Sequence, residues 1–379
     1  MMNNVEEFTA LLRVMVEKKA SDLFLTAGLP PCLKIHGSLL PIGIETLSPH
    51  QVRALAYQVM NDDQRHEFET TQECNFALSD PSIGRFRVNV FVQKYQVGMV
   101  LRKIETTIPT LADLRLPTLL AELAMSKRGL VVIVGATGSG KSTTLAAMIG
   151  HRNQNSSGHI ITIEDPIEFI HEHGGCVVTQ REVGVDTQSF ENALKNTLRQ
   201  APDVILIGEI RTRETMSHAI AFAETGHLCF ATLHANNANQ ALDRIVNFFS
   251  DDRRNQLLLD LSLNLKAVVA QQLVPTPDRQ GRRLAVEILL NTPLVAQLIH
   301  KGEFHKLKEL MKKSTTLGMQ TFDQALLQLY DAGEISYEDT LHHADAPNEL
   351  RLLVKLGKDG GIDKLQSALD GMELIEPRR

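Results

Sequence analysis

The sequence has no tryptophan, and aromatic residues make up only 5% of its 379 positions. Such a chain offers few rings on which the bases of a single-stranded nucleic acid could stack. It also lacks an excess of basic charge, because 39 Lys and Arg face 45 Asp and Glu, for a formal net charge of −6. Proteins that coat nucleic acid need clustered positive charge to neutralise phosphates. The composition therefore disfavours a nucleic-acid partner.

Disulfide pairing and membrane-spanning segments are likewise not expected. The four cysteines are far apart and form no C-x-x-C pair, which indicates a reducing compartment. No run approaches the roughly 18 apolar residues of a membrane-spanning helix, and the first residues have neither the basic nor the apolar region of a secretory signal. We therefore expect a cytoplasmic protein.

The length predicts two domains or one large one, either able to bury a core. Over residues 1–107, short stretches with helical spacing alternate with stretches of strand character. The expected elements there are a helix over 5–19, strands over 22–26 and 32–35, a helix opening at Ser48-Pro49, and paired strands over 85–92 and 97–104. This pattern predicts a small α+β domain.

The second half of the chain has a different pattern. Short, nearly continuous apolar runs at 130–134, 159–163, 204–207 and 228–232 alternate with helical stretches. Such runs are typical of a parallel sheet covered on both faces, so an α/β fold is predicted. After Asp251 the chain is expected to be mostly helical. We divide it into domain 1–107, linker 108–119, domain 120–353 and a C-terminal extension over 354–379.

A phosphate-binding loop follows the first of these strands. Residues 135–142 have the pattern G-x-x-x-x-G-K-S. Glycines let the backbone curl so that its N–H groups converge on phosphate oxygens at the N-terminus of the next helix. Lys141 would reach the β- and γ-phosphates, and the Ser142 hydroxyl would bind Mg²⁺. The predicted nucleotide-binding residues are Gly135, Ala136, Thr137, Gly138, Ser139, Gly140, Lys141, Ser142 and Thr143.

Candidate acids and histidines lie at the ends of the predicted strands. Glu164 and Glu209 each follow one, at the carboxyl edge where open α/β sheets bind ligands. His227 and His234 bracket another. The alternative role of the two glutamates is a helix cap or a solvated turn, and that of the two histidines is a packed or capping side chain.

Five lysines gather between residues 301 and 313, interrupted by Glu303 and Glu309. Two interpretations are open for them. The plainer one is a solvated helix face, and the other is contact with an acidic partner or a membrane surface.

Four segments occur in the order of the motifs of one protein family. They are the loop at 135–142, Thr-Ile-Glu-Asp-Pro-Ile-Glu-Phe at 162–169, the segment 203–211 and the segment 226–236. Two N-terminal segments match as well, Ala-Ser-Asp-Leu at 20–23 and Gly-Arg-Phe-Arg-Val-Asn at 84–89. The chain thus resembles the secretion-superfamily ATPases, and its compact N-terminal domain is similar to the type IV pilus retraction branch.

The resemblance implies a RecA-like P-loop ATPase domain and a smaller PAS-like N-terminal domain. It also implies hexameric rings in which ATP hydrolysis, with Mg²⁺, drives pilus retraction and twitching motility through an inner-membrane platform protein. The chain would then be cytoplasmic and peripheral at the inner membrane.

The resemblance also assigns roles by position. Glu164 would be the general base, and Glu209 would be the Walker B acid beside Mg²⁺. The remaining implied residues are His227 and His234 of the His box, and Arg87 and Arg102, which would reach the phosphates.

One segment departs from the pattern of the retraction branch. Where its members carry Ala-Ile-Arg-Asn-Leu-Ile, residues 294–299 read Leu-Val-Ala-Gln-Leu-Ile. The missing Arg-Asn pair favours a paralogue that assists a principal retraction ATPase, in a homomeric or a mixed ring. Two further hypotheses are a nucleotide-binding accessory subunit whose hydrolysis is slow or dispensable, and a RecA-like nucleic-acid translocase.

Overall fold

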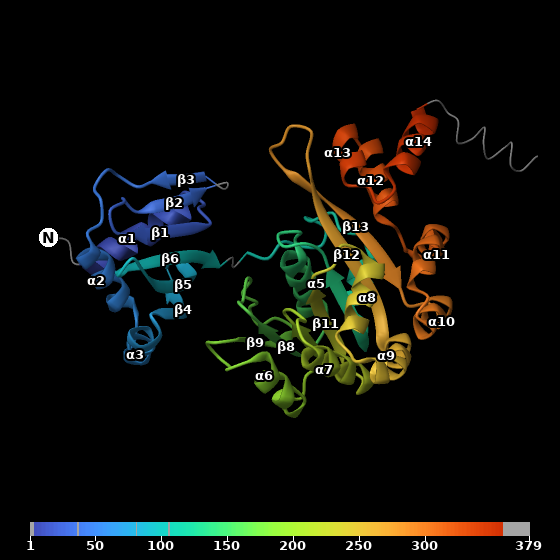
Figure 1. Cartoon of the computed structure of the whole chain (residues 1–379), viewed down its shortest axis with the longest axis horizontal. Helices are drawn as coiled ribbons and strands as arrows, with labels where there is room; N and C mark the ends of the chain where they lie inside the picture. The colour runs from blue at the N-terminus through green and yellow to red at the C-terminus, as the bar shows by residue number, and fades with distance from the viewer. Residues whose placement is uncertain (1–3, 36–37, 81, 105–106, 359–379) are drawn as a thin grey trace, which may run out of the picture. The chain divides into compact units, whose positions relative to one another are not determined.

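The computed structural model describes residues 4–35, 38–80, 82–104 and 107–358 (Figure 1). By backbone contacts the chain divides into two compact units, Met1–Pro109 with Arg152–Gly208, and Thr110–His151 with Glu209–Arg379. This division passes through the larger of two β-sheets. The domain limits at 107, 119 and 353 therefore remain predictions. Of the predicted extension 354–379, residues 359–379 lie outside the described part of the chain.

The N-terminal residues form a six-stranded sheet in the order β3-β2-β1-β6-β5-β4, in which all neighbours are antiparallel. Its strands are β1 (Asp22–Thr26), β2 (Cys32–Ile35), β3 (Ser38–Pro41), β4 (Glu73–Asp80), β5 (Gly84–Gln93) and β6 (Gln96–Ile104). Its helices are α1 (Asn4–Glu17), α2 (Pro49–Val59) and α3 (Asp62–Thr71). Alternate side chains of β5 and β6 enter a core shared with these helices. The predicted α+β character is confirmed, as is the helix start at Ser48, whose side chain caps α2.

The larger sheet has seven strands in the order β13-β12-β7-β11-β10-β8-β9. They are β7 (Gly129–Val134), β8 (Gly158–Glu164), β9 (Cys176–Glu182), β10 (Val204–Ile207), β11 (Leu228–Leu233), β12 (Leu265–Pro275) and β13 (Arg282–Leu290). Every residue of β7, β10 and β11 is buried, and β7 pairs in parallel with β11 as β8 does with β10. The apolar runs were therefore correctly interpreted as parallel strands.

After Asp251 the described residues are mostly helical, as predicted, but two strands in this part of the chain were not predicted. β12 and β13 form a long antiparallel hairpin, drawn in orange in Figure 1. The helix α9 (Asp251–Asn264) passes directly into β12 at Leu265, with neither glycine nor proline between them. The chain carries no local breaker signal there, and pairing of β12 with the buried strand β7 decides its conformation.

Helices accompany the second sheet and complete the C-terminal part. They are α4 (Leu119–Ala124), α5 (Lys141–Asn155), α6 (Phe190–Thr197), α7 (Arg213–Glu224), α8 (Ala238–Asn247), α10 (Pro293–Lys301), α11 (Leu307–Lys313), α12 (Phe322–Asp331), α13 (Tyr337–His342) and α14 (Pro347–Lys358). In the described part of the chain, no helix has the length and apolar character needed to cross a membrane.

Candidate nucleotide-binding site

The predicted phosphate loop connects the buried strand β7 to the helix α5. Gly135 opens the loop with a φ of 155°, and a Cβ atom there would lie 2.5 Å from the Gln271 carbonyl oxygen and 2.4 Å from Ser139 Oγ. Those distances are far below van der Waals contact, so only glycine fits where the loop leaves the sheet. Gly138 and Gly140 also have positive φ values, of 77° and 90°. The loop thus curls as the glycine pattern predicts.

Polar groups converge on this loop. The Lys141 side chain is 9% exposed, and its Nζ donates to the carbonyl oxygens of Gly135, at 2.9 Å, and Ala136, at 3.0 Å. Ser139 Oγ is buried and has no hydrogen-bond partner among the residues that the structure describes. Ser142 stands half-buried in the first turn of α5. A cation, an unsatisfied hydroxyl and a helix N-terminus fit a phosphate, and the Ser142 hydroxyl fits a hard cation such as Mg²⁺.

Glu209 and His234 meet beside this loop. His234 Nε2 lies 3.0 Å from Glu209 Oε1, and Arg211 donates to Glu209 Oε2 at 2.6 Å. His234 follows the last residue of β11, and Gly135 follows the last residue of β7, which is the register partner of that residue. The strand pairing therefore places His234 at the same sheet edge as the loop.

Glu164 ends β8 and has a different environment. Its Oε1 accepts hydrogen bonds from Thr162 Oγ1 at 2.6 Å and from Gln180 Nε2 at 3.2 Å. Desolvation in this surrounding raises the pKa of the carboxyl to about 7, although the two hydrogen bonds oppose the rise. A carboxyl with a pKa near neutrality is suited to accept a proton.

His227 lies at the other end of its strand from His234. It precedes β11, and its Nδ1 lies 3.0 Å from Thr225 Oγ1 and 3.3 Å from the Phe222 carbonyl oxygen at the end of α7. Contacts of this kind are typical of a residue that caps the C-terminus of a helix, here α7. A role for His227 at the phosphates stays a prediction.

Two arginines of the N-terminal sheet, those predicted to reach the phosphates, are brought together. Arg87 on β5 and Arg102 on β6 are directly opposite in the strand register. Arg102 also pairs with Asp22 on β1, with its Nε 2.8 Å from Asp22 Oδ1.

Two cavities are lined in part by the phosphate loop and the first turn of α5. One of about 510 Å³ is bordered by Gly140, Thr143 and Thr144, by the segment 113–117, and by apolar side chains of the hairpin and α12 such as Leu273. The other, of about 470 Å³, is lined by Gly135, Ala136, His234 and the adjoining face of α8. Both cavities have mixed linings, since charged side chains such as Arg283 and Glu334 also border the larger one.

The family described as Type II/IV secretion system protein matches residues 8–342. The chain belongs to this family. Among family members, it is 66% identical over 368 residues to the type IV pilus ATPase PilU of Pseudomonas aeruginosa, across 97% of this chain and 96% of that protein. It is 41% identical to the pilus retraction ATPase PilT of the same organism, across 90% and 99% of the two chains. The resemblance to the pilus retraction branch of the secretion ATPases, expected from the motifs, is confirmed.

Solved structures of family members support the fold. The crystal structure of the pilus retraction motor PilT with bound ADP has a TM-score of 0.84 and 40% identity, and it covers 90% of this chain and 98% of that one. The ATPase DotB of Legionella pneumophila has a TM-score of 0.74 and 28% identity, with coverage of 88% and 94%. The predicted α/β fold with a RecA-like ATPase domain is thereby confirmed.

Some residues of the site were missed in the sequence. Gln271 of β12 donates to Thr144 Oγ1 at 2.8 Å and so supports the first turn of α5. Gln180 of β9 holds Glu164. Neither residue belongs to a recognisable motif, and β12 and β9 were not predicted as strands. A correct strand order was the only signal that could have found them.

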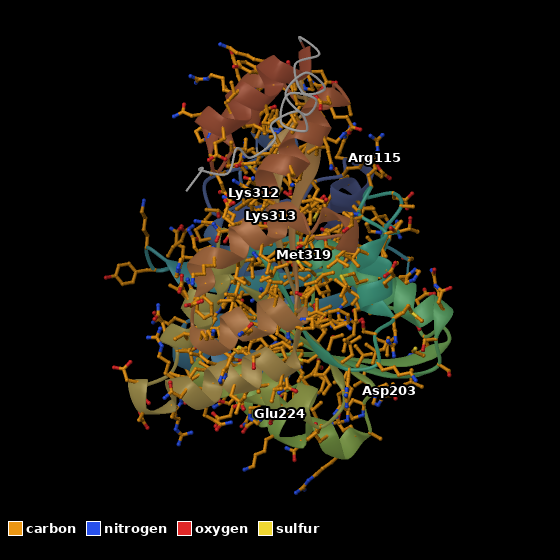
Figure 2. All side chains as sticks on the ribbon, turned by 90° about the vertical axis from the view of Figure 1, so that its right-hand side faces the viewer. Arg115, Asp203, Glu224, Lys312, Lys313 and Met319 are labelled. Atoms are coloured by element: carbon orange, nitrogen blue, oxygen red, sulfur yellow. The ribbon has the colours of Figure 1, made fainter. Side chains whose placement is uncertain are left out.

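The lysine-rich segment has local partners. Lys306 pairs with Glu303, Lys308 with Asp345, and Lys312 with both Glu309 and Glu349, at distances from 2.6 to 3.3 Å. Figure 2 labels Lys312 and Lys313 on the C-terminal helical part. Since three of the five lysines are paired within the chain, the solvated helix face is favoured over an acidic partner.

Proposed function

We propose that this chain is an ATP-hydrolysing motor subunit of type IV pilus retraction, the process behind twitching motility. The observation that carries the proposal is the phosphate loop with Lys141 at its mouth, in a chain 66% identical to a pilus ATPase over 97% of its length. The absence of the Arg-Asn pair from 294–299 supports an assisting role beside a principal retraction ATPase.

In this proposal the phosphates of ATP bind at residues 135–143, and the nucleoside enters the 510 Å³ cavity between the segment 113–117 and Leu273. Ser142 and Glu209 would hold Mg²⁺, which neutralises charge on the phosphate oxygens when bound. Apolar side chains of the larger cavity, such as Leu273, would pack against the base, and the smaller cavity beside His234 would hold water and phosphate.

Each polar residue then has a distinct task. Glu164 accepts the proton of the attacking water, for which its raised pKa is suited. His234 and Arg211 hold the Glu209 carboxylate. Arg87 and Arg102 would approach the phosphates, where such a guanidinium typically contributes about 10³ to 10⁵ in rate.

The proposed assembly is a hexamer, either homomeric or mixed with a paralogous retraction ATPase. It would work in the cytoplasm, peripheral at the inner membrane, on an inner-membrane pilus platform protein. Nucleic acid is not a proposed partner. The domain limits proposed are those of the sequence, with 1–107 as the PAS-like domain and 120–353 as the ATPase domain.

The test is steady-state ATPase activity with Mg²⁺, comparing the wild-type chain with Glu164→Gln. We expect the variant to lose at least about two orders of magnitude, since a positioned general base contributes roughly that much. Glu172→Gln is the matched control, because it makes the same acid-to-amide change at a nearby exposed residue, and it should keep the wild-type rate.

The accessory-subunit alternative makes the opposite prediction. If wild type and Glu164→Gln are equally inactive while both still bind nucleotide, the catalytic assignment is wrong for the isolated protein. The chain would then act by binding nucleotide next to an active partner.

A further inference from the structure

We propose that Asp22 is a positioning residue, which holds the Arg102 guanidinium so that its two terminal nitrogens are presented to phosphate oxygens. The inference deepens the proposed function and rests on it, because it concerns how one of the two phosphate-directed arginines is kept in place.

Three charged residues form a row across the N-terminal sheet. In the strand register, Asp22 of β1 faces Arg102 of β6, and Arg102 in turn faces Arg87 of β5. Directly opposite residues carry their side chains on the same face of a sheet. Two like charges placed in this way destabilise a sheet, so the pair of arginines needs a countercharge. Asp22 supplies it from the next strand.

The environment of Asp22 makes it a fixed support. Asp22 is 3% exposed, whereas the Arg102 side chain is 66% exposed. One carboxylate oxygen of Asp22 accepts from Arg102 Nε at 2.8 Å, and the other accepts from Ser21 Oγ at 2.9 Å. Ser21 is itself held, because its backbone N–H donates to the Lys34 carbonyl oxygen at 2.9 Å. The carboxylate therefore cannot turn away from the arginine without losing both bonds.

The contact with Asp22 uses only the Nε atom of Arg102 and leaves its two terminal nitrogens available for a ligand. Asp22 engages Nε, and among the residues that the structure describes no hydrogen bond or ion pair is found for Nη1 or Nη2 of Arg102. A guanidinium anchored in this way presents two parallel donors, the geometry that matches two oxygens of one phosphate. Because the anchor is already formed, less side-chain freedom is lost when the phosphate binds.

The test is a double-mutant cycle in the full-length chain, on Asp22→Asn, Arg102→Ala and the double variant. Two quantities are measured with Mg²⁺: kcat and KM for ATP, and the Kd of a fluorescent non-hydrolysable ATP analogue, which reports on Arg102 without turnover. Asp22→Asn should lower kcat and raise the Kd of the analogue, each about tenfold, because loss of a residue that supports a binding residue commonly has an effect of this size. In the Arg102→Ala background it should change neither quantity further.

Two variants guard against trivial results. Asp62→Asn removes the carboxylate of another Asp–Arg pair of the same domain, with Arg65, and should leave both quantities unchanged. If Asp22→Asn fails to fold, as judged by thermal unfolding, Ser21→Ala replaces it, since it removes the second hydrogen bond to Asp22 and leaves the carboxylate in place; it also removes the longer contact of Ser21 Oγ with the Lys34 carbonyl oxygen, at 3.2 Å. Ser21→Ala should lower kcat and affinity by a few-fold, and only where Arg102 is present.

The possible outcomes distinguish the positioning role of Asp22 from the phosphate-binding role of Arg102. If Arg102→Ala weakens binding or turnover while folded Asp22→Asn matches the wild type, the positioning role is wrong and the arginine keeps its task. Fully additive losses in the double variant would also overturn the positioning role, because Asp22 would then act without Arg102. If Arg102→Ala changes neither quantity, the phosphate role of Arg102 fails and the inference fails with it.

Discussion

Two carboxylates that follow neighbouring parallel strands have different surroundings. Glu164 ends β8, and Glu209 follows β10, whose residue Ile207 pairs with Ile163. Glu164 is desolvated and receives hydrogen bonds only from neutral groups, so its pKa rises to about 7. Glu209 is held by Arg211 and His234. The environments thus suit a proton acceptor and a metal ligand, respectively, from the same side-chain type.

This difference predicts a pH dependence of turnover. Glu164 must be ionised to accept a proton, so kcat should fall as pH drops through about 7 and should approach a tenfold loss per pH unit at lower pH. The measurement is kcat with saturating Mg·ATP between about pH 5.5 and 8.5. The residual activity of Glu164→Gln should be flat over that range. An equal slope in this variant would assign the titration to another group.

At the scale of elements, strand β13 fixes where helix α8 begins. Glu287 of β13 is 2% exposed and accepts a hydrogen bond at 2.8 Å from the backbone N–H of Ala238, the first residue of α8. Burial raises the pKa of this carboxyl to about 7, with Asp345 adding to the rise and Lys308 opposing it. Since α8 starts four residues after His234, the hairpin that the sequence did not predict supports the loop that carries His234.

We expect Glu287→Gln to remove a pH-dependent loss of stability. Between about pH 4.5 and 7 the folded protein keeps a proton on Glu287 that the unfolded chain has released, so the free energy of unfolding falls as pH rises. From pH 5 to pH 8 the wild type should therefore lose stability relative to Glu287→Gln, by on the order of 2 kcal/mol. Thermal unfolding at the two pH values measures this. The control variant Glu338→Gln, at an exposed position, should lose as much stability between the two pH values as the wild type does. If Glu287→Gln also loses as much as the wild type, the prediction is wrong.

The elements also show what the sequence could and could not predict. Local patterns located β7, β8, β10 and β11 to within a residue or two, because a buried parallel strand reads as an apolar run. Motif spacing located the loop 135–142. Local patterns do not show which strands pair across long sequence separations. The strand β12, whose conformation depends on pairing with β7, was therefore missed. For the same reason the contact of Asp22 with Arg102, 80 residues apart, required the strand register.

At the scale of the whole molecule, charge is mostly compensated within the chain. The net charge is −6, and the lysines of the segment 301–313 form several pairs with nearby acids. No strong charge of one sign is left on that segment to attract a polyanion.

The proposed ring predicts that subunits do not hydrolyse ATP independently. Wild-type chain mixed with Glu164→Gln chain, at constant total concentration, should lose activity more steeply than the wild-type fraction falls, because a subunit that cannot turn over holds its neighbours in one conformation. The measurement is ATPase rate against wild-type fraction, with sedimentation in Mg·ATP to follow species near six times the 42.1 kDa chain mass. Lys141→Ala is the matched second mixing partner: if it cannot bind nucleotide, it should inhibit less than Glu164→Gln, which still binds ATP. A straight line for both partners would mean that each chain acts alone and would contradict the ring.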